Sequence, residues 1–301
     1  MKSKDSATVV RTRVISPGVL WGFVGVVAFS FTLPVTRFAV EAGIPATFLG
    51  SARAVVAAAL AVIALAFTRQ RLPLRRLWPR LAVVAAGVVV GFPLLTSYAL
   101  ETTEASHGAV VIALLPAATA VIAVLRGRER PGARFWIAAG LGAVAAVAFA
   151  AVNGGGFGSF ASADLLLLGA VVAAGVGYAE GGLLARELGA WQTISWALVL
   201  SAPVMLVVSA ASAATEPITA SPAAWGAFAY LGVVSMFLGF FAWYRGLAIG
   251  PMSIVSQVQL TQPVMSLVWA ALLLGEVLRW ETAVGVVAVI ACAAFAVRSR
   301  R

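Results

Sequence analysis

The polar side chains most able to bind a solute within this apolar sequence lie between residues 244 and 280. Four of them recur at spacings of three and four residues: Ser256, Gln259, Gln262 and Ser266. This spacing puts the four side chains on one face of a helix. Pro263, in the middle of the segment, frees the backbone beside them. Because amides exposed to lipid are costly, we expect this face to line a cavity.

Three further side chains could titrate or carry charge within apolar segments. Glu180 is the clearest carboxylate inside a predicted span, and it either pairs with Arg186 at the membrane interface or serves as a substrate or proton site. His107, the only histidine, lies at the start of an apolar segment, where it suits an interfacial or capping residue as well as a titrating gate. Arg53 could pair within the bundle, but we expect it to snorkel outward.

The elements that hold these residues are helices in a membrane. The chain is 62% hydrophobic and 11% charged, whereas ordinary soluble domains are about 45–50% apolar and about 25% charged. Crossing the hydrocarbon takes about 20 apolar residues per helix. Ten segments meet this requirement: 18–40, 46–67, 81–100, 107–125, 135–152, 164–184, 191–210, 223–244, 252–274 and 282–297. We therefore predict an all-α integral membrane protein with ten transmembrane helices.

The net charge of +10 reflects membrane topology rather than nucleic-acid binding. If the N-terminus is cytoplasmic, every Lys and Arg falls in a tail or loop on that side except Arg37, Arg53 and Arg279. The positive-inside rule then places both termini in the cytoplasm. We expect the protein to lie in the cell's inner (cytoplasmic) membrane, with the lipid bilayer as its surroundings and no nucleic acid as a partner.

The sequence repeats itself at an offset of 147 residues. This offset superposes pairs of uncommon residues: Trp78 on Trp225, Pro116 on Pro263 and Glu129 on Glu276. Each half has five predicted spans, an odd number, so the second half must enter the membrane from the opposite side. We predict two inverted five-helix repeats, with these divisions: a cytoplasmic tail 1–16, a first repeat 17–152, a Gly-rich linker 153–163, a second repeat 164–297 and a basic cytoplasmic tail 298–301.

One motif occurs at corresponding places in both halves. Tyr98-Ala-Leu is followed by ALLPAATAVIAVLRGRE in the first half, and Tyr244-Arg-Gly-Leu is followed by TQPVMSLVWAALLLGE in the second. With Trp21 in a kinked first helix and Arg53 in GSARAVVAAAL, these features resemble the EamA-type ten-helix exporters of the drug/metabolite transporter superfamily over essentially the whole chain. The first copy departs from the usual pattern at residues 126–128, where Arg-Gly-Arg precedes the glutamate.

The resemblance implies a secondary transporter with a central cavity lined by helices one, three, four, six, eight and nine. We expect export of amino acids or similar small metabolites by alternating access, driven by the substrate gradient or coupled to protons. Cationic drugs, nucleosides and sugar derivatives are the alternative substrates. Ten side chains are expected in the cavity: Tyr98, His107, Thr119, Tyr178, Glu180, Tyr244, Ser256, Gln259, Gln262 and Ser266. Each of them could instead hydrogen-bond a neighbouring helix.

The residues needed for several kinds of catalysis are missing from the sequence. Lys2 and Lys4 are the only lysines, so no P-loop is present. A metal or haem site would have one histidine and Cys292, the one cysteine, to draw on. We therefore expect neither enzymatic activity, nor a metal, nor a cofactor. A passive channel would need a continuous polar pore, which ten apolar helices with one polar stripe do not supply.

Overall fold

The fold is a bundle of long apolar helices. The computed structural model describes residues 17–127, scattered residues between 132 and 148, and residues 162–299 apart from 251–254, 256 and 257. The first half contains α1 (Pro17–Ser30), α2 (Thr32–Glu41), α3 (Ala46–Phe67), η1 (Arg75–Leu77), α4 (Trp78–Val84), η2 (Ala85–Gly91), α5 (Phe92–Thr102), α6 (Ala105–Ile112) and α7 (Leu115–Gly127). The second half contains α9 (Ser162–Leu188), α10 (Ala190–Thr215), α11 (Pro222–Ala229), η3 (Tyr230–Leu238), α12 (Gly239–Ile249), η4 (Gln259–Thr261), α14 (Gln262–Leu274) and α15 (Trp280–Ser299).

The helices match the predicted fold class of an all-α membrane protein. Seven of the predicted spans are present as apolar helical segments of 22 to 28 residues, which is long enough to cross a membrane. The predicted ninth span contains a shorter apolar helix, Gln259–Leu274, and the predicted tenth span lies within α15. The predicted fifth span, 135–152, lies largely outside the described residues. The chain is therefore a multi-pass membrane protein.

Two predicted spans differ in detail from the observed helices. The first is interrupted at Phe31, where α1 ends and α2 begins, three residues before Pro34. The third begins at Arg75 rather than at residue 81. Pro79 occupies the first turn of α4, where a helix has no use for the missing N–H group. Pro263 likewise lies in the first turn of α14 rather than in mid-helix.

The 147-residue offset found in the sequence recurs in the helix boundaries. The segment Arg75–Thr102 corresponds to Pro222–Ile249, and both are 28 residues long. Each contains a stretch of π-helix, η2 in the first half and η3 in the second. The equivalent of η2, residues 232–238, lies entirely within η3, so the two halves share a local distortion as well as a span length. π-Helical turns are rare and are frequently found at functional sites.

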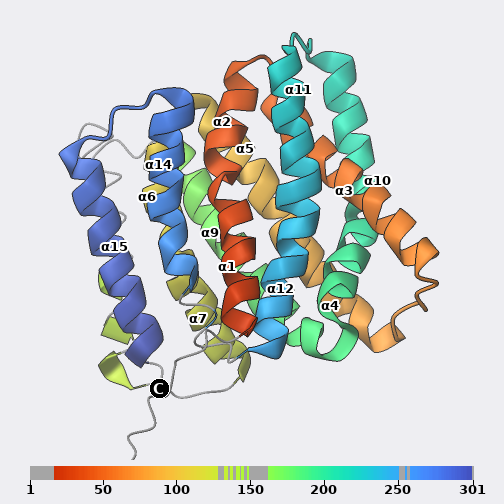
Figure 1. Cartoon of the computed structure of the whole chain (residues 1–301), viewed down its shortest axis with the longest axis horizontal. Coiled ribbons are helices and arrows are strands. Elements are labelled where there is room, and N and C mark those ends of the chain that lie inside the picture. Colours follow the sequence, from red (N-terminus) through yellow and green to blue (C-terminus); the bar gives the residue numbers. More distant parts are fainter. Residues whose placement is uncertain are drawn as a thin grey trace, which may run out of the picture.

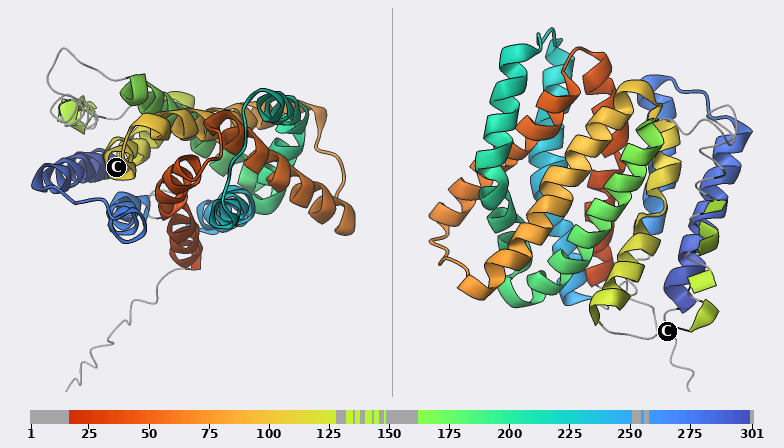
Figure 2. Two further views of the ribbon diagram at one scale, coloured as in Figure 1. Left: turned by 90° about the horizontal axis from the view of Figure 1, so that it is seen from above. Right: turned by 180° about the vertical axis from the view of Figure 1, so that it is seen from behind.

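The helices of the two halves interlock rather than forming separate bundles. α1 packs along α12, and α3 packs along α10. Figure 1 shows α1 and α12 side by side in the middle of the molecule, with α15 at one edge and the loop from α3 to α4 at the other. Figure 2 gives the same arrangement from above and from behind. Any cavity at the centre is therefore bounded by helices from both halves.

Glycines bring α1 and α12 unusually close together. A Cβ atom built on Gly246 would lie 2.6 Å from the backbone nitrogen of Gly22 and 2.8 Å from the carbonyl oxygen of Gly18. These are backbone atoms, which cannot rotate away as a side chain could. Small residues at such contacts are typical of helix pairs in membranes, where close van der Waals packing replaces the hydrophobic effect.

Two sets of contacts mark the two ends of the bundle. At one end, Arg80 of α4 and Arg126 of α7 both donate to the carboxylate of Glu180 on α9. We call this the Arg80 end; it is the lower end in Figure 1. At the other end, the two backbone N–H groups that begin α6 donate to the carboxylate of Glu276, each over 2.8 Å. We call this the Glu276 end.

Candidate substrate pocket

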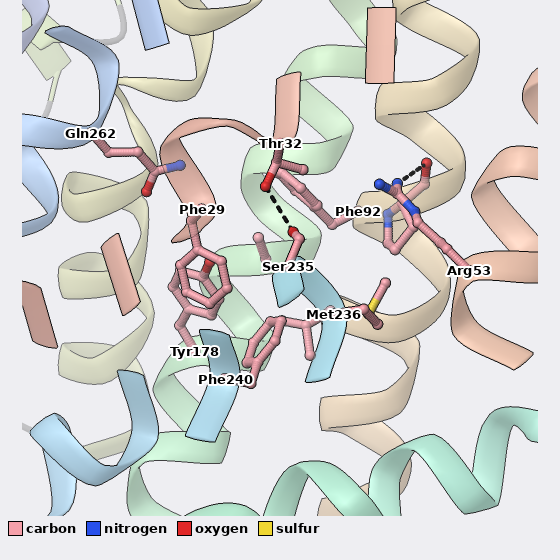
Figure 3. A pocket seen from close by; sticks show the side chains of 12 residues that line it. Phe29, Thr32, Arg53, Phe92, Tyr178, Ser235, Met236, Phe240 and Gln262 are labelled. Atoms are coloured by element: carbon pink, nitrogen blue, oxygen red, sulfur yellow. Dashed lines mark hydrogen bonds between the residues drawn. The ribbon is translucent and has the colours of Figure 1, made fainter. Parts of the chain in front are cut away.

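A pocket lies between the two halves of the chain, within the bundle. Its lining combines aromatic rings, small hydroxyl groups, one amide and one arginine: Phe29, Thr32, Arg53, Val88, Phe92, Pro93, Ala174, Tyr178, Ser235, Met236, Phe240 and Gln262. Figure 3 shows these side chains converging from helices that are far apart in the sequence. The first half supplies α1, α2, α3, η2 and α5, and the second half supplies α9, η3, α12 and α14.

The pocket is small in this conformation. It encloses about 20 Å³, which is room for roughly one water molecule. A metabolite could therefore enter only when the lining side chains or their helices move apart.

Three aromatic rings form one wall of the pocket. Phe29 on α1 stacks on Tyr178 of α9 with the ring centroids 6.2 Å apart, and it contacts Phe240 of α12 at 4.9 Å. Tyr178 also contacts Phe240, at 5.9 Å, and Trp243 behind it, at 5.7 Å. The wall is apolar on its face and would contact a flat or branched apolar group.

The break in the first span supplies polar groups opposite this wall. Thr32, just after the break, shares a hydrogen bond of 2.8 Å with Ser235 of η3 (Figure 3). At the 147-residue offset Ser235 corresponds to Val88 of η2, which also lines the pocket. The two π-helical stretches thus direct equivalent positions of the two halves to one site, and this recurrence is a signal that the sequence repeat could have provided.

Arg53 is buried in the pocket wall, so the prediction that it snorkels outward is wrong. The residue is 1% exposed. Its Nη2 donates to the carbonyl oxygen of Pro93 over 2.8 Å, and longer contacts of 3.4 and 3.5 Å reach the hydroxyls of Thr36 and Thr96. The side chain cannot snorkel because α3 packs against α5 and η3. The alternative expectation, pairing within the bundle, is met by neutral oxygens.

Two of the ten predicted cavity residues line this pocket: Tyr178 and Gln262. Gln262 is 6% exposed, and its Oε1 has no hydrogen-bond partner in the described part of the chain. Tyr244 lies one helical turn beyond Phe240, is fully buried, and donates its hydroxyl proton to the carbonyl of Gly177 over 3.1 Å. Tyr244 therefore holds α12 against α9 behind the pocket.

The polar stripe of the ninth span is only partly directed at the pocket. Ser266 donates to the carbonyl oxygen of Ser30 over 2.7 Å, which joins α14 to the break in the first span. Gln259 is 2% exposed, and both of its amide atoms lack partners among the described residues. Ser256 lies outside the described residues.

Three other predicted cavity residues have hydrogen-bond or charge partners outside the described pocket lining. Tyr98 is 39% exposed and shares a hydrogen bond of 2.8 Å with Thr47 of α3. Thr119 bonds within its own helix, to the carbonyl of Leu115. His107 lies at the Glu276 end, with its Nε2 atom 2.7 Å from Oδ1 of Asp164. The structure thus places none of the three in the lining described above.

Glu180 is buried at the Arg80 end, outside the pocket lining. It is 2% exposed and receives hydrogen bonds from Arg80 and from two nitrogens of Arg126, at 2.6 and 3.1 Å. The predicted pairing with Arg186 is wrong: Glu180 pairs instead with Arg80 on α4 and Arg126 on α7. Arg186, on the same helix, is not the partner because the Glu180 side chain faces neighbouring helices. The spacing of residues along one helix does not reveal which helices lie beside it.

The lining helices also differ in part from those that the resemblance implied. The fourth span, α6 and α7, contributes no residue to the described pocket, and the second span contributes Arg53. The reason is packing: α7 lies against α9 and α15, while α3 lies against η3 and α5. Among the described residues, no group of three or more His, Cys, Asp or Glu side chains is placed to hold a metal ion.

Comparison with known proteins agrees with this architecture. The model of the EamA-like transporter family matches residues 16–151 and again residues 161–298. The chain is 45% identical over 289 residues to an uncharacterized transporter, YdeK, of Bacillus subtilis (strain 168), across 93% of this chain and 97% of that protein. A solved structure described only as "Crystal structure of protein" shares the fold, with a TM-score of 0.64, 18% identity and coverage of 93% and 96% of the two chains.

Proposed function

The chain belongs to the EamA-like transporter family. On that basis we propose that it is a secondary transporter of small metabolites, above all amino acids, which pass through the pocket between its two halves. The observation that carries the proposal is the pocket itself, which is buried, lined by both repeats and mixed in polarity. A carrier needs a site that both halves can close over.

The lining chemistry supports amino acids over permanently cationic drugs. No Asp or Glu lines the described pocket, so a fixed cation would find no counter-charge there. Arg53 and the hydroxyls of Thr32 and Ser235 offer donors, while Gln262 offers a free acceptor. A zwitterion with an apolar or aromatic body would match these groups better than a sugar derivative, which needs many more polar partners.

We further propose that the two repeats are inverted relative to each other and that transport proceeds by alternating access. The fourth span begins at the Glu276 end and reaches the Arg80 end, whereas α14, its counterpart, runs toward Glu276. The first span begins beside Gly250, which follows the end of α12 at the lower, Arg80 end in Figure 1. Its counterpart α9 has Asp164 in its first turn, at the Glu276 end. The contracted pocket supports the same mechanism, because binding requires movement of the halves.

The distribution of charges supports one orientation in the membrane. Arg76, Arg80 and Arg126 gather at the Arg80 end, and a side rich in arginine is the cytoplasmic one. We propose that this end faces the cytoplasm and that the protein resides in the cytoplasmic membrane, exporting its substrate.

The test is counterflow with the purified full-length protein in liposomes. Liposomes loaded with an unlabelled amino acid should accumulate the labelled amino acid transiently and saturably. Flux that rises linearly with concentration would instead indicate a channel. Counterflow of nucleosides or cationic drugs, but not of amino acids, would replace the proposed substrate class. Repeating the assay with an imposed pH gradient asks whether protons are coupled to transport.

Replacement of Gln262 by alanine is expected to weaken substrate binding by about 3- to 10-fold, since the loss of one hydrogen bond to a solute costs about 0.5–1.5 kcal/mol. The measurement is the concentration for half-maximal counterflow. Thr261→Ala is the matched control, because Thr261 is the exposed neighbour and its hydroxyl bonds within the chain to Val258. An unchanged half-maximal concentration in Gln262→Ala would remove this amide from the binding site.

A further inference from the structure

Arg53 is a buried cation without a carboxylate partner. It is 1% exposed, and within the described part of the chain no Asp or Glu lies within ion-pair distance of it. Two acidic residues of comparable burial both have partners: Glu180 receives two arginines, and Asp164 lies beside His107. A buried charge is usually compensated by a partner, because its removal from water is unfavourable. Arg53 therefore lacks a partner of opposite charge, which Glu180 has.

The guanidinium group of Arg53 also has unused hydrogen-bonding capacity. It carries five N–H donors. Its described partners are the carbonyl of Pro93, bound by one strong hydrogen bond, and two hydroxyls at longer distances. The Nε atom is buried and has no hydrogen-bond partner among the residues that the structure describes. Nε and a terminal nitrogen form the fork that binds the two oxygens of a carboxylate.

The Arg53 side chain belongs to the wall of the pocket. Arg53 is one of the lining residues, and Figure 3 shows its side chain extending from α3 among the others, on the side of Thr32 and Phe92. The aromatic wall of Phe29, Tyr178 and Phe240 belongs to the same pocket. The guanidinium group of Arg53 is the only charged group in the described lining. The electrostatics of the pocket therefore favour an anion.

We propose that Arg53 binds the carboxylate of the transported solute, and that the pocket selects monocarboxylates with an apolar or aromatic body, for which the carboxylate is required and an ammonium group is not. This inference rests on the proposed transport function and narrows its substrate class. An ammonium group would meet only neutral acceptors, such as the carbonyl oxygen of Gln262. A carboxylate would meet a desolvated positive charge, and such charge-assisted bonds are about twice as strong as neutral ones.

The experiment compares three probes that share a phenyl ring and chain. Phenylalanine has both charged groups, 3-phenylpropanoate has only the carboxylate, and phenethylamine has only the ammonium. Each is tested as a competitor of labelled-substrate counterflow and as a ligand in thermal-shift measurements on the purified full-length protein. A second set, leucine, 4-methylpentanoate and 3-methylbutylamine, covers aliphatic bodies. We expect both carboxylates of each set to bind and the amines to be at least 10-fold weaker.

Variants of Arg53 provide the second arm. Arg53→Gln keeps a donor for Pro93 but removes the charge, and it should weaken the carboxylates by about 10- to 100-fold and leave the amines unchanged. Arg53→Lys keeps the charge without the planar fork, so its affinity for the carboxylates should fall between those of the unaltered protein and of Arg53→Gln. The matched control is Arg37→Gln, since Arg37 pairs with Glu41 and the carbonyl of Leu100 away from the pocket. If Arg53→Gln does not fold, the probe series on the unaltered protein and on Arg53→Lys decides.

The outcomes separate this inference from the proposed function. Amino-acid counterflow that amines inhibit as well as carboxylates do, or that Arg53→Gln retains at full affinity, would overturn the role of Arg53 and leave amino-acid transport standing. Binding of 3-phenylpropanoate without counterflow of any amino acid would retain the carboxylate site and overturn the proposed substrate. If no carboxylate of either set binds the unaltered protein, both proposals are wrong.

Discussion

Replacement of Glu180 by glutamine is expected to lower the free energy of unfolding by about 2–3 kcal/mol. The change leaves two guanidinium groups, those of Arg80 and Arg126, without their shared carboxylate. Removing one partner of a fully buried pair costs about 3–5 kcal/mol. The expected loss is smaller here because the Arg80 and Arg126 side chains are 30% and 56% exposed and can recover some hydration.

Thermal unfolding of the purified protein measures this effect, and a midpoint lower by about 5–10 °C is expected. Glu187→Gln is the matched control: Glu187 also pairs with two arginines, but its side chain is 36% exposed. Exposed pairs are worth about 0–1 kcal/mol, so its midpoint should change by a few degrees at most. Equal effects of the two substitutions would show that the burial of Glu180 does not strengthen its ion pairs.

The Glu180→Gln variant should also loosen the Arg80 end, because three spans are joined there through one carboxylate. Cys292 is the only cysteine, so a Cys292→Ser background allows a single probe at Ser235→Cys in the pocket. We expect this probe to react with a water-soluble maleimide several-fold faster when Glu180 is replaced. An unchanged rate would mean that these ion pairs do not close that end.

Replacement of Gly246 by alanine is expected to destabilise the protein by about 2–3 kcal/mol, the upper range for overpacking by one methyl group. The new Cβ would lie within 3 Å of backbone atoms of Gly18 and Gly22. Since these atoms cannot move independently, α1 and α12 would have to separate along their whole contact. The readouts are the thermal midpoint and the fraction of monodisperse protein recovered in detergent.

Gly226→Ala is the control for this substitution. Gly226 lies in α11, and nothing lies within 4 Å of the position its Cβ would take. There the methyl group only improves helix propensity, by about 0.5–1 kcal/mol, so stability should stay constant or rise. A Gly246→Ala protein as stable as Gly226→Ala would contradict the close packing of α1 and α12.

The packing of the helices also accounts for the predictions that failed or changed. Tyr98 and Thr119 are polar groups in apolar helices, as Gln262 is, yet only Gln262 reaches the pocket. A membrane helix is apolar nearly all round, so its sequence does not tell which face meets protein and which meets lipid. Arg53 could have been recognised, because a charge two turns inside a span is a functional-site candidate in its own right.

The sequence by itself determined the membrane environment, most of the span boundaries and the duplication at 147 residues. These properties are local: twenty apolar residues partition into a bilayer whatever surrounds them, and a repeat is visible in the residues themselves. Only the tertiary structure decided that Arg53 lines the pocket and that Glu180 pairs with Arg80 and Arg126. Those contacts join residues 40 to 100 positions apart, and they depend on how the helices rotate and pack, which no spacing along one helix encodes.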